Sequence, residues 1–357
     1  MNRYVIDRAK LAGNIERVKR VAGVPVMGVV KANGYGFGLQ ELARMLLEHG
    51  IRAFAVTEIE DVAPLREVVD DASDVLVMRS TALPEEARAI VGAGCIVTVG
   101  SLAAARAAAD AACELGVRAR CHLKVDTGFG RYGFSPSDKP GILACYRMGE
   151  LAFEGMYTHF SAAYHDVALT RSQLAAFEGV AALVEEAGFA AGVRHAANSP
   201  ALFNVPETRL DMVRIGSAFT GRVITLEPNE LDRVGFLESQ VIDLKTLPAG
   251  STVGYGGEAK LARQTRVAFV SAGTQEGFGV AAEKPATMRR ALSAARGALE
   301  RRRLEVRMGE RAYPVIGEAD LSLSLVDVTD GDVKIGDLAR MDINPLMVSP
   351  KVPRVYV

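Results

Sequence analysis

Residues 24–38 read VPVMGVVKANGYGFG. The run Val24–Val30 has the length and β-branched content of a buried strand. It ends at Lys31, a glycine-rich segment follows, and Leu39–Glu48 then repeats apolar residues at helical spacing. The stretch predicts a strand, a turn and a helix in succession, with an amine at the carboxyl end of the strand.

The same alternation continues through the first two-thirds of the chain. Runs recur about every 20 to 40 residues, which leaves room for a crossover helix between parallel strands. Two further examples of such helices are Leu102–Leu115 and Leu174–Ala187. Eight units fit a (β/α)8 barrel of the TIM type; a doubly wound sheet is the alternative, and the number of units favours closure. The predicted strands are 24–30, 53–57, 75–78, 96–99, 120–126, 153–159, 193–197 and 212–215.

After about residue 230 the pattern changes. Strand-like runs are separated by Pro-Ala-Gly at 248–250, Gly-Gly at 256–257 and Asp-Gly at 330–331, which are turn signals. We therefore predict a barrel over residues 1–230 and a mostly antiparallel β domain over 231–357. The basic segment 284–303 predicts an inserted amphipathic helix with a solvated face. The runs are Phe236–Thr246, Thr265–Val270, Ala312–Ile316 and Leu323–Val328.

The composition narrows the function classes. The 357 residues carry a net charge of −1, so bulk charge gives no reason to expect nucleic acid or a membrane surface as partner. The N-terminus is charged and lacks the apolar core of a secretory signal, and we see no apolar run long enough to span a bilayer. The four cysteines form no CxxC pair, so no metal site is expected. We expect a cytoplasmic protein.

Polar residues stand where the predicted strands end. Active sites of such barrels lie at the carboxyl ends of the strands, so six polar residues around one ring predict a shared site. They are Lys31, Arg79, Asp126, His159, Asn198 and Arg214.

Lys31 is the most informative of these residues. Burying an ammonium group costs free energy, and desolvation favours the neutral amine that condensation with a carbonyl compound needs. Glycines flank Tyr35 in the following segment, so the backbone can approach a ligand closely and the phenol can donate to an anion. The segment therefore predicts an anionic ligand beside a reactive amine.

Several segments, in order, resemble the motifs of one family. VVKANGYGFG (29–38) resembles the cofactor-lysine motif of alanine racemases, which are fold-type III pyridoxal-phosphate enzymes. The other matching segments are HLKVDTGFGRYGF (122–134; family KxDTGMGRxGF), EGMYTHFS (154–161; family EGxxTHFA), HAANS (195–199), LDMVRIG (210–216) and VGYG (253–256; family VSYG). The resemblance covers nearly the whole chain and implies a racemase that interconverts L- and D-forms of alanine or another small amino acid.

The resemblance implies a role for each matched residue. Lys31 would bind pyridoxal 5'-phosphate and transfer a proton on one face of the substrate, with Tyr255 of the partner subunit on the other face of a homodimer's shared site. Arg131 would bind the substrate carboxylate and the cofactor phenolate, Arg214 the pyridine nitrogen, and His159 would lie between Arg214 and Tyr255. The phosphate ligands would be Tyr35, Ser199, Gly216 and Ser217, supported by Asn198. Lys124 matches a lysine that is carbamylated in some members; an unmodified lysine is the default here.

The phosphate site has support independent of the resemblance. Barrels often bind phosphate in the loops after the seventh and eighth strands, which is where Asn198-Ser199 and Gly216-Ser217 stand. Helix capping is the alternative role for these residues.

Three departures from the family pattern fall in the β domain. The family's GYxDG reads GTQEG here, with Thr274 in place of an aromatic residue; its Met-Asp pair reads Leu321-Ser322; and a phosphate-binding tyrosine is replaced by Pro350. They suggest that the substrate or its entry has changed while the cofactor chemistry is kept.

Three alternatives stay open. A related barrel decarboxylase would need a cysteine in the β domain, but all four cysteines precede residue 146. A non-catalytic cofactor-binding barrel would lack the β domain. A degenerate relative that only scaffolds or regulates would bind no cofactor.

Overall fold

The computed structural model describes residues 2–254, 257, 259–280 and 304–357, and the chain forms two compact units. One unit is Ala9–Val234; the other combines Gly235–Val357 with the N-terminal strand. Tyr255 and the helix predicted over 284–303 lie outside the described residues.

The first unit is the predicted barrel. Eight parallel strands pair in the order β8-β7-β6-β5-β4-β3-β2-β9. A parallel bridge between His195 and Met212 joins β8 to β9 and closes the ring. The strands are β2 (Val26–Val29), β3 (Ala53–Val56), β4 (Asp74–Val77), β5 (Ile96–Val99), β6 (Ala119–Lys124), β7 (Leu151–Tyr157), β8 (Val193–His195) and β9 (Val213–Ile215). The closed barrel is confirmed, and the doubly wound sheet is excluded.

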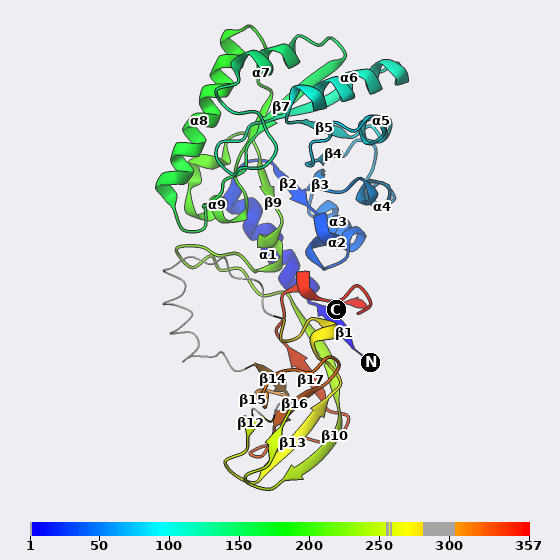
Figure 1. The fold of residues 1–357 in the computed structure, drawn as a ribbon, viewed down its shortest axis with the longest axis vertical. Helices are drawn as coiled ribbons and strands as arrows, with labels where there is room; N and C mark the ends of the chain where they lie inside the picture. The colour runs from blue at the N-terminus through cyan, green and yellow to red at the C-terminus, as the bar shows by residue number, and fades with distance from the viewer. Residues whose placement is uncertain (1, 255–256, 258, 281–303) are drawn as a thin grey trace. The chain divides into compact units, whose positions relative to one another are not determined.

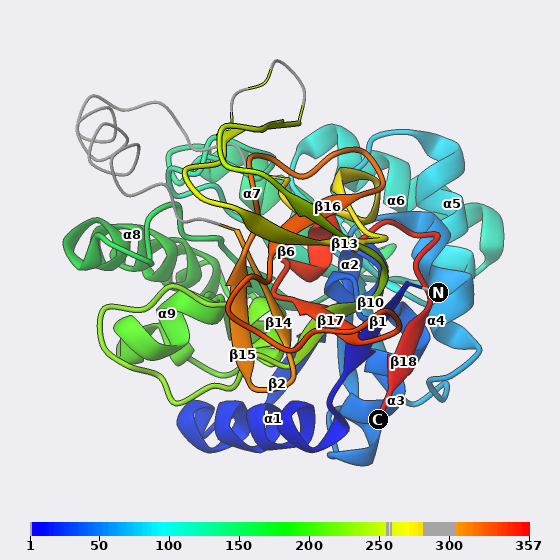
Figure 2. The same ribbon diagram turned by 90° about the horizontal axis from the view of Figure 1, so that it is seen from below.

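Helices cover the outside of the strands (Figures 1 and 2). One of them, α6 (Leu102–Leu115), begins where the Ser101 hydroxyl accepts the Ala104 amide and ends at the left-handed Gly116. The others are α1 (Arg8–Ala22), α3 (Leu39–Glu48), α4 (Val62–Arg66), α5 (Pro84–Gly92), α7 (Lys139–Tyr146), α8 (Val167–Glu186) and α9 (Ser199–Asn204), with 3-10 turns at Ile59–Asp61, Pro206–Arg209 and Ser217–Thr220.

The turn after β2 has an unusual backbone. The short element α2 (Lys31–Tyr35) is left-handed: φ is 52° at Ala32, 52° at Asn33 and 54° at Tyr35. Each such non-glycine residue costs of order 1–3 kcal/mol, and such strain clusters at functional sites. The Asn33 side chain accepts the Leu39 amide at 3.0 Å and so ties the turn to the start of α3.

The second unit is an eight-stranded, mostly antiparallel sheet. Its main path is β15-β14-β17-β10-β1-β18, and β13 pairs with β10 and β16. The strands are β1 (Arg3–Ile6), β10 (Gly235–Leu247), β13 (Thr265–Val270), β14 (Glu305–Met308), β15 (Arg311–Pro314), β16 (Ser324–Asp327), β17 (Leu338–Met341) and β18 (Arg354–Tyr356). A separate hairpin joins β11 (Thr252–Val253) to β12 (Ala259–Lys260), and 3-10 turns lie at Thr274–Glu276 and Pro345–Met347.

The domain boundary differs from the prediction at the N-terminus. We assigned residues 1–230 to the barrel, but β1 belongs to the sheet of the other unit because its two edges pair with β10 and β18. These partners are more than 200 residues away along the chain, so no local pattern reveals them. At the other end of the barrel, the boundary falls at Val234–Gly235.

One helix also qualifies the prediction that no run could span a bilayer. By length and composition alone, α8 would be long and apolar enough to do so. Its buried side chains include Leu174, Phe177, Val180 and Val184, which recur at helical spacing and form one face, as in a helix that covers a barrel.

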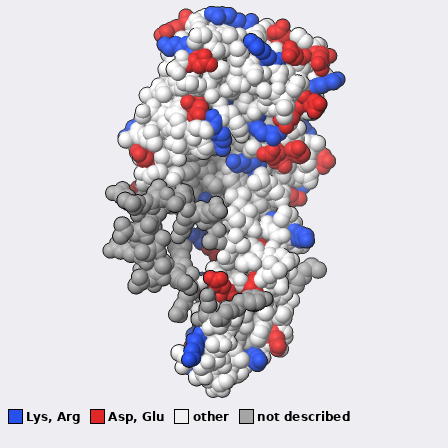
Figure 3. Space-filling view, viewed as in Figure 1, with Lys and Arg blue, Asp and Glu red and all other residues white. Residues whose placement is uncertain are grey.

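On the face of the barrel unit that Figure 3 shows, acidic and basic side chains are interspersed.

Candidate active site

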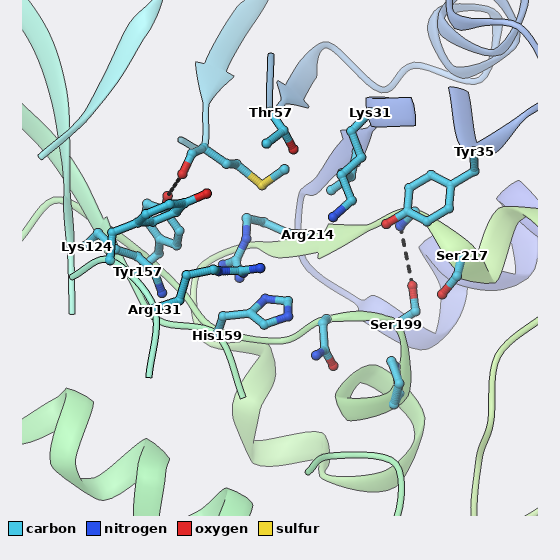
Figure 4. A pocket seen from close by; sticks show the side chains of 16 residues that line it. Lys31, Tyr35, Thr57, Lys124, Arg131, Tyr157, His159, Ser199, Arg214 and Ser217 are labelled. Atoms are coloured by element: carbon cyan, nitrogen blue, oxygen red, sulfur yellow. Dashed lines mark hydrogen bonds between the residues drawn. The ribbon is translucent and has the colours of Figure 1, made fainter. Parts of the chain in front are cut away.

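A cavity of about 230 Å³ opens at the carboxyl ends of the barrel strands, and every residue that lines it belongs to the barrel unit. Figure 4 shows side chains from several strand ends converging on one space. The lining residues are Val29, Lys31, Tyr35, Thr57, Met78, Lys124, Arg131, Tyr132, Tyr157, His159, Asn198, Ser199, Pro200, Arg214, Gly216 and Ser217.

Nine of the ten predicted site residues line this cavity. The tenth, Tyr255, lies outside the described residues. Two members of the predicted ring of strand-end residues do not line it. Arg79 forms ion pairs with Glu58 and Glu86. The Asp126 carboxylate accepts a hydrogen bond from the Gly128 amide in its own loop, and neither residue lines the cavity.

The cavity wall is strongly cationic. Lys31, Lys124, Arg131 and Arg214 line it, and no carboxylate does among its described residues. Such a wall fits a ligand that carries phosphate and carboxylate groups. The charge of the cavity wall therefore suits pyridoxal phosphate and an amino acid.

Lys31 follows β2 directly, and its amine points into the cavity (Figure 4). Desolvation lowers the pKa of Lys31 below its ordinary value, and the positive charges of Arg131 and Arg214 lower it further. All three effects favour the neutral amine, because each disfavours the ammonium form. The geometry therefore supports the predicted use of this amine.

Arg214 lies on β9 and is fully enclosed. It donates to the Thr158 carbonyl at 2.7 Å, to the His195 carbonyl at 2.8 Å and to Nδ1 of His195 at 3.1 Å. Burial lowers the pKa of Arg214 to about 10, so the guanidinium remains charged at neutral pH. Its described hydrogen bonds go to His195 and Thr158, and none goes to His159, which the resemblance places between Arg214 and Tyr255.

Two buried histidines continue this chain of hydrogen bonds. Since the guanidinium can only donate, Nδ1 of His195 accepts and its proton sits on Nε2. Nε2 then donates to Nδ1 of His122 at 2.9 Å. Desolvation lowers the pKa of His122 to about 4 and that of His195 well below its usual range, so both rings are neutral. Both histidines stand in family-like motifs without a predicted role, because their positions on β6 and β8 face each other only when the barrel closes.

Lys124 ends β6 in the barrel interior. Its Nζ donates to the Val125 carbonyl at 3.3 Å and lies 4.7 Å from the ring centre of Tyr157. Burial, with Arg214 and Arg131 nearby, lowers the pKa of Lys124 well below its ordinary value. The Tyr157 ring also stacks on His195 and lies beneath Arg214. Sequence reasoning missed Tyr157, because an aromatic residue in a strand is usually core.

The opposite end of the cavity is suited to a phosphate group. The Ser199 hydroxyl accepts the amides of Gly216 and Ala218 at 3.4 and 3.2 Å. Burial raises the pKa of Tyr35 to about 12, so its hydroxyl keeps the proton that an anion can accept. Asn198 uses its side-chain oxygen to cap α9 at the Ala201 amide, the alternative role considered for it. Hydroxyl donors and a cationic wall fit the phosphate of the cofactor.

Gly216 is the tightest point of this end. A Cβ there would lie 2.2 Å from Cε2 and 2.6 Å from the hydroxyl of Tyr35. We predict that Gly216→Ala weakens cofactor binding roughly five- to a hundredfold, because overpacking costs about 1–3 kcal/mol. Titration of the cofactor-free protein with pyridoxal phosphate measures the effect. Gly179→Ala is the matched control, since a Cβ there meets nothing within 4 Å; equal affinities in the two variants would contradict the assignment.

The three departures from the family pattern are neighbours within the β unit. The amides of Thr274 and Gln275 donate to the carbonyls of Asp320 and Leu321 at 2.9 and 2.8 Å. The Ser349 amide, one residue before Pro350, donates to the Glu276 carbonyl at 3.4 Å. The Leu321 side chain is 67% exposed, so no packing within the described residues explains its identity. The departures therefore alter one local region.

Comparisons with known proteins agree on one family. Residues 6–223 match the family described as "Alanine racemase, N-terminal domain", and residues 234–343 match "Alanine racemase, C-terminal domain". The alanine racemase of Desulfosudis oleivorans is 34% identical over 93% of this chain and 85% of its own length, and that of Thermobifida fusca is 33% identical over 94% and 86%. The alanine racemase structure from the D-cycloserine producer Streptomyces lavendulae has a TM-score of 0.87 at 26% identity, covering 100% of this chain and 97% of its own.

Proposed function

The chain belongs to the alanine racemase family and is a pyridoxal-phosphate-dependent amino-acid racemase, and we propose that its substrate is alanine. The observation that carries this proposal is the cavity in which the amine of Lys31 and the guanidinium groups of Arg131 and Arg214 converge, with the pKa of Lys31 lowered by burial and by the two arginines. The decarboxylase alternative is disfavoured, because the relatives reported above are racemases.

Lys31 would hold the cofactor and move a proton at the substrate Cα. When bound, pyridoxal phosphate delocalises the electron pair left behind when the Cα proton is removed. Nζ of Lys31 accepts that proton from one face and returns it to the same face in the reverse direction. Burial and the charges of Arg131 and Arg214 lower the pKa of Lys31, which supports this role because they make the neutral, proton-accepting amine easier to form.

The two arginines would orient the ligands. Arg131, in the loop after β6, binds the substrate carboxylate, which a guanidinium contacts through two parallel hydrogen bonds. Arg214 would donate to the pyridine nitrogen of the cofactor. Since a guanidinium has no acceptor, it would disfavour protonation of that nitrogen and so limit side reactions such as transamination. The hydrogen bonds to His195 and Thr158 support this role, because they fix its planar group.

A second proton-transfer group is needed on the opposite face, and we assign it to Tyr255 of a partner subunit. Tyrosine is a poor base at its reference pKa near 10, so a cationic environment has to favour the phenolate. The resemblance supplies this assignment and the homodimer that it requires.

Mixed dimers provide a test of this sharing. If each site combines Lys31 of one subunit with Tyr255 of the other, Lys31→Ala and Tyr255→Phe homodimers should both be inactive. Subunit exchange between them should restore one intact site per mixed dimer and up to about a quarter of the wild-type activity in a statistical mixture, since half the dimers are mixed and each has one site. Tagged variants purified as mixed dimers allow a direct assay. Mixed dimers as inactive as their parents, or a fully active monomer, would exclude a shared site.

The substrate assignment is tested with a panel of L-amino acids. We expect D-alanine from L-alanine, and the reverse, at higher kcat/KM than for any other amino acid in the panel. Chiral chromatography of the products measures both directions. The rival outcome is a changed substrate, which the departures at Thr274, Leu321 and Pro350 suggest. A larger or more polar amino acid turned over faster than alanine would show that change. No D-product from any amino acid, with no cofactor bound, would favour the degenerate relative.

The protein would act in the cytoplasm on a free amino acid, without nucleic acid or membrane as partner. The support is the net charge of −1, which gives no bulk attraction to nucleic acid or to a membrane surface. Cell fractionation tests the location.

A further inference from the structure

The Asp126 carboxylate shapes the turn at Gly128–Gly130 in the loop after β6. One carboxylate oxygen of Asp126 accepts the amides of Gly128, Phe129 and Gly130 at 3.0, 2.8 and 3.2 Å. Burial opposes ionisation of Asp126, but these donors hold its pKa below the ordinary value. Phe129 is thus placed by its own backbone amide, and its side chain projects from a fixed turn.

The ring of Phe129 contacts two residues of the active site. Cζ of Arg131 lies 4.5 Å from the centre of the Phe129 ring, and the ring of Tyr132 lies on the same guanidinium at 5.5 Å. The Phe129 ring also meets the His159 ring edge to face, with centroids 5.1 Å apart. Among the described residues, the interactions found for the Arg131 guanidinium are with these two rings rather than with a carboxylate.

Phe129 lies at the surface rather than in the core. The residue is 40% exposed. Since Phe129 is not part of the core, its contribution to the stability of the fold is small. The family segment KxDTGMGRxGF has methionine at this position. The two contacts of its ring are both with cavity-lining residues.

We propose that Phe129 is a positioning residue for the racemase reaction: its ring fixes the Arg131 guanidinium for the substrate carboxylate and shields His159 from water. This proposal rests on the proposed function, in which Arg131 binds that carboxylate. A guanidinium stacked on a ring is already ordered, so less side-chain freedom is lost when the carboxylate binds. Loss of the ring should therefore weaken substrate binding rather than slow the proton transfer.

Shielding by the Phe129 ring should affect the pKa of His159. Desolvation holds the pKa of His159 well below its ordinary value, and the neighbouring arginine and lysine side chains act in the same direction. These groups are Arg214 on β9, Lys124 on β6, Arg131 on the loop after β6, and Lys31 after β2. Removing the Phe129 ring would leave these charges in place but admit water, so the titration midpoint of His159 should rise.

Two substitutions separate the two effects. Phe129→Leu still covers His159 but offers no ring face, so KM for alanine should rise about two- to fivefold, the range for a cation–π contact at an exposed site, with kcat nearly unchanged. Phe129→Ala should give the same rise in KM and also raise the His159 midpoint. Phe129→Tyr keeps the ring and should restore both properties. Since Phe129 is not a core residue, all three variants should fold.

Steady-state kinetics and NMR of histidine labelled at Cε1 measure these properties in the holoenzyme. The chain has five histidines, and a His159→Asn variant identifies the resonance. Leu169→Ala is the matched control, since Leu169 is 43% exposed on α8 and is not among the residues that line the cavity. An unchanged KM in both ringless variants, or an unchanged His159 midpoint in Phe129→Ala, would overturn the proposal. A wild-type protein without racemase activity would instead defeat the proposed function, while the titration would still report the shielding.

Discussion

Replacing Lys31 by alanine should abolish racemisation and the visible absorption of the covalently held cofactor. The variant loses both the amine that holds the cofactor and the group that moves the proton on one face, so we expect activity to fall by more than about 10⁴-fold. The loss should be chemical rather than structural, because Lys31 stands at the rim of the barrel, lines the cavity and is not a core residue.

Absorption spectra and initial rates, recorded with excess pyridoxal phosphate, measure both effects. Lys139→Ala provides the matched control, since Lys139 is exposed at the start of α7 and is not among the cavity-lining residues. A Lys31→Ala variant that keeps the absorption band and a substantial rate would refute the assignment of this amine.

Tyr255→Phe should lose racemisation by about 10²- to 10⁴-fold while it keeps the cofactor, because general acid–base catalysis by one positioned group contributes a factor of this size. Lys31 remains able to remove the Cα proton on its own face. In deuterated water, one enantiomer of alanine should therefore still exchange its Cα hydrogen without inverting, and the other should not.

Proton NMR of the two enantiomers measures this asymmetry, and the absorption band reports the cofactor. Tyr146→Phe is the control, because the buried Tyr146 hydroxyl has no hydrogen-bond partner among the described residues. Normal racemisation by Tyr255→Phe would show that the second face is served by another group.

Local sequence patterns predicted the barrel well, since each strand–helix unit carries its own periodicity. For example, α3 and α6 begin and end at the predicted residues. The position of β1 could not be predicted in this way. Its pairing depends on strands at the other end of the chain, and four residues with one exposed position carry too little pattern to identify a sheet.

Only some of the residues of the site were predicted from the sequence. Lys31 and Arg214 were identified from their places at strand ends, but the same rule also selected Arg79 and Asp126. The rule fails there because it gives the position of a residue and not the direction of its side chain, which local partners decide. The opposite error concerned Tyr157 and His122, which were not assigned a role. Tyr157 lines the cavity beneath Arg214, and His122 lies behind it, bonded to His195, because the closed barrel brings these strands together.

The proposed reaction depends on which amine holds the cofactor. Borohydride reduction of the holoenzyme fixes pyridoxal phosphate on that amine, and mass spectrometry of the digested protein then identifies the modified peptide. We predict that the modified residue is Lys31. Modification of another lysine such as Lys124, or an unmodified protein after reduction, would contradict the account.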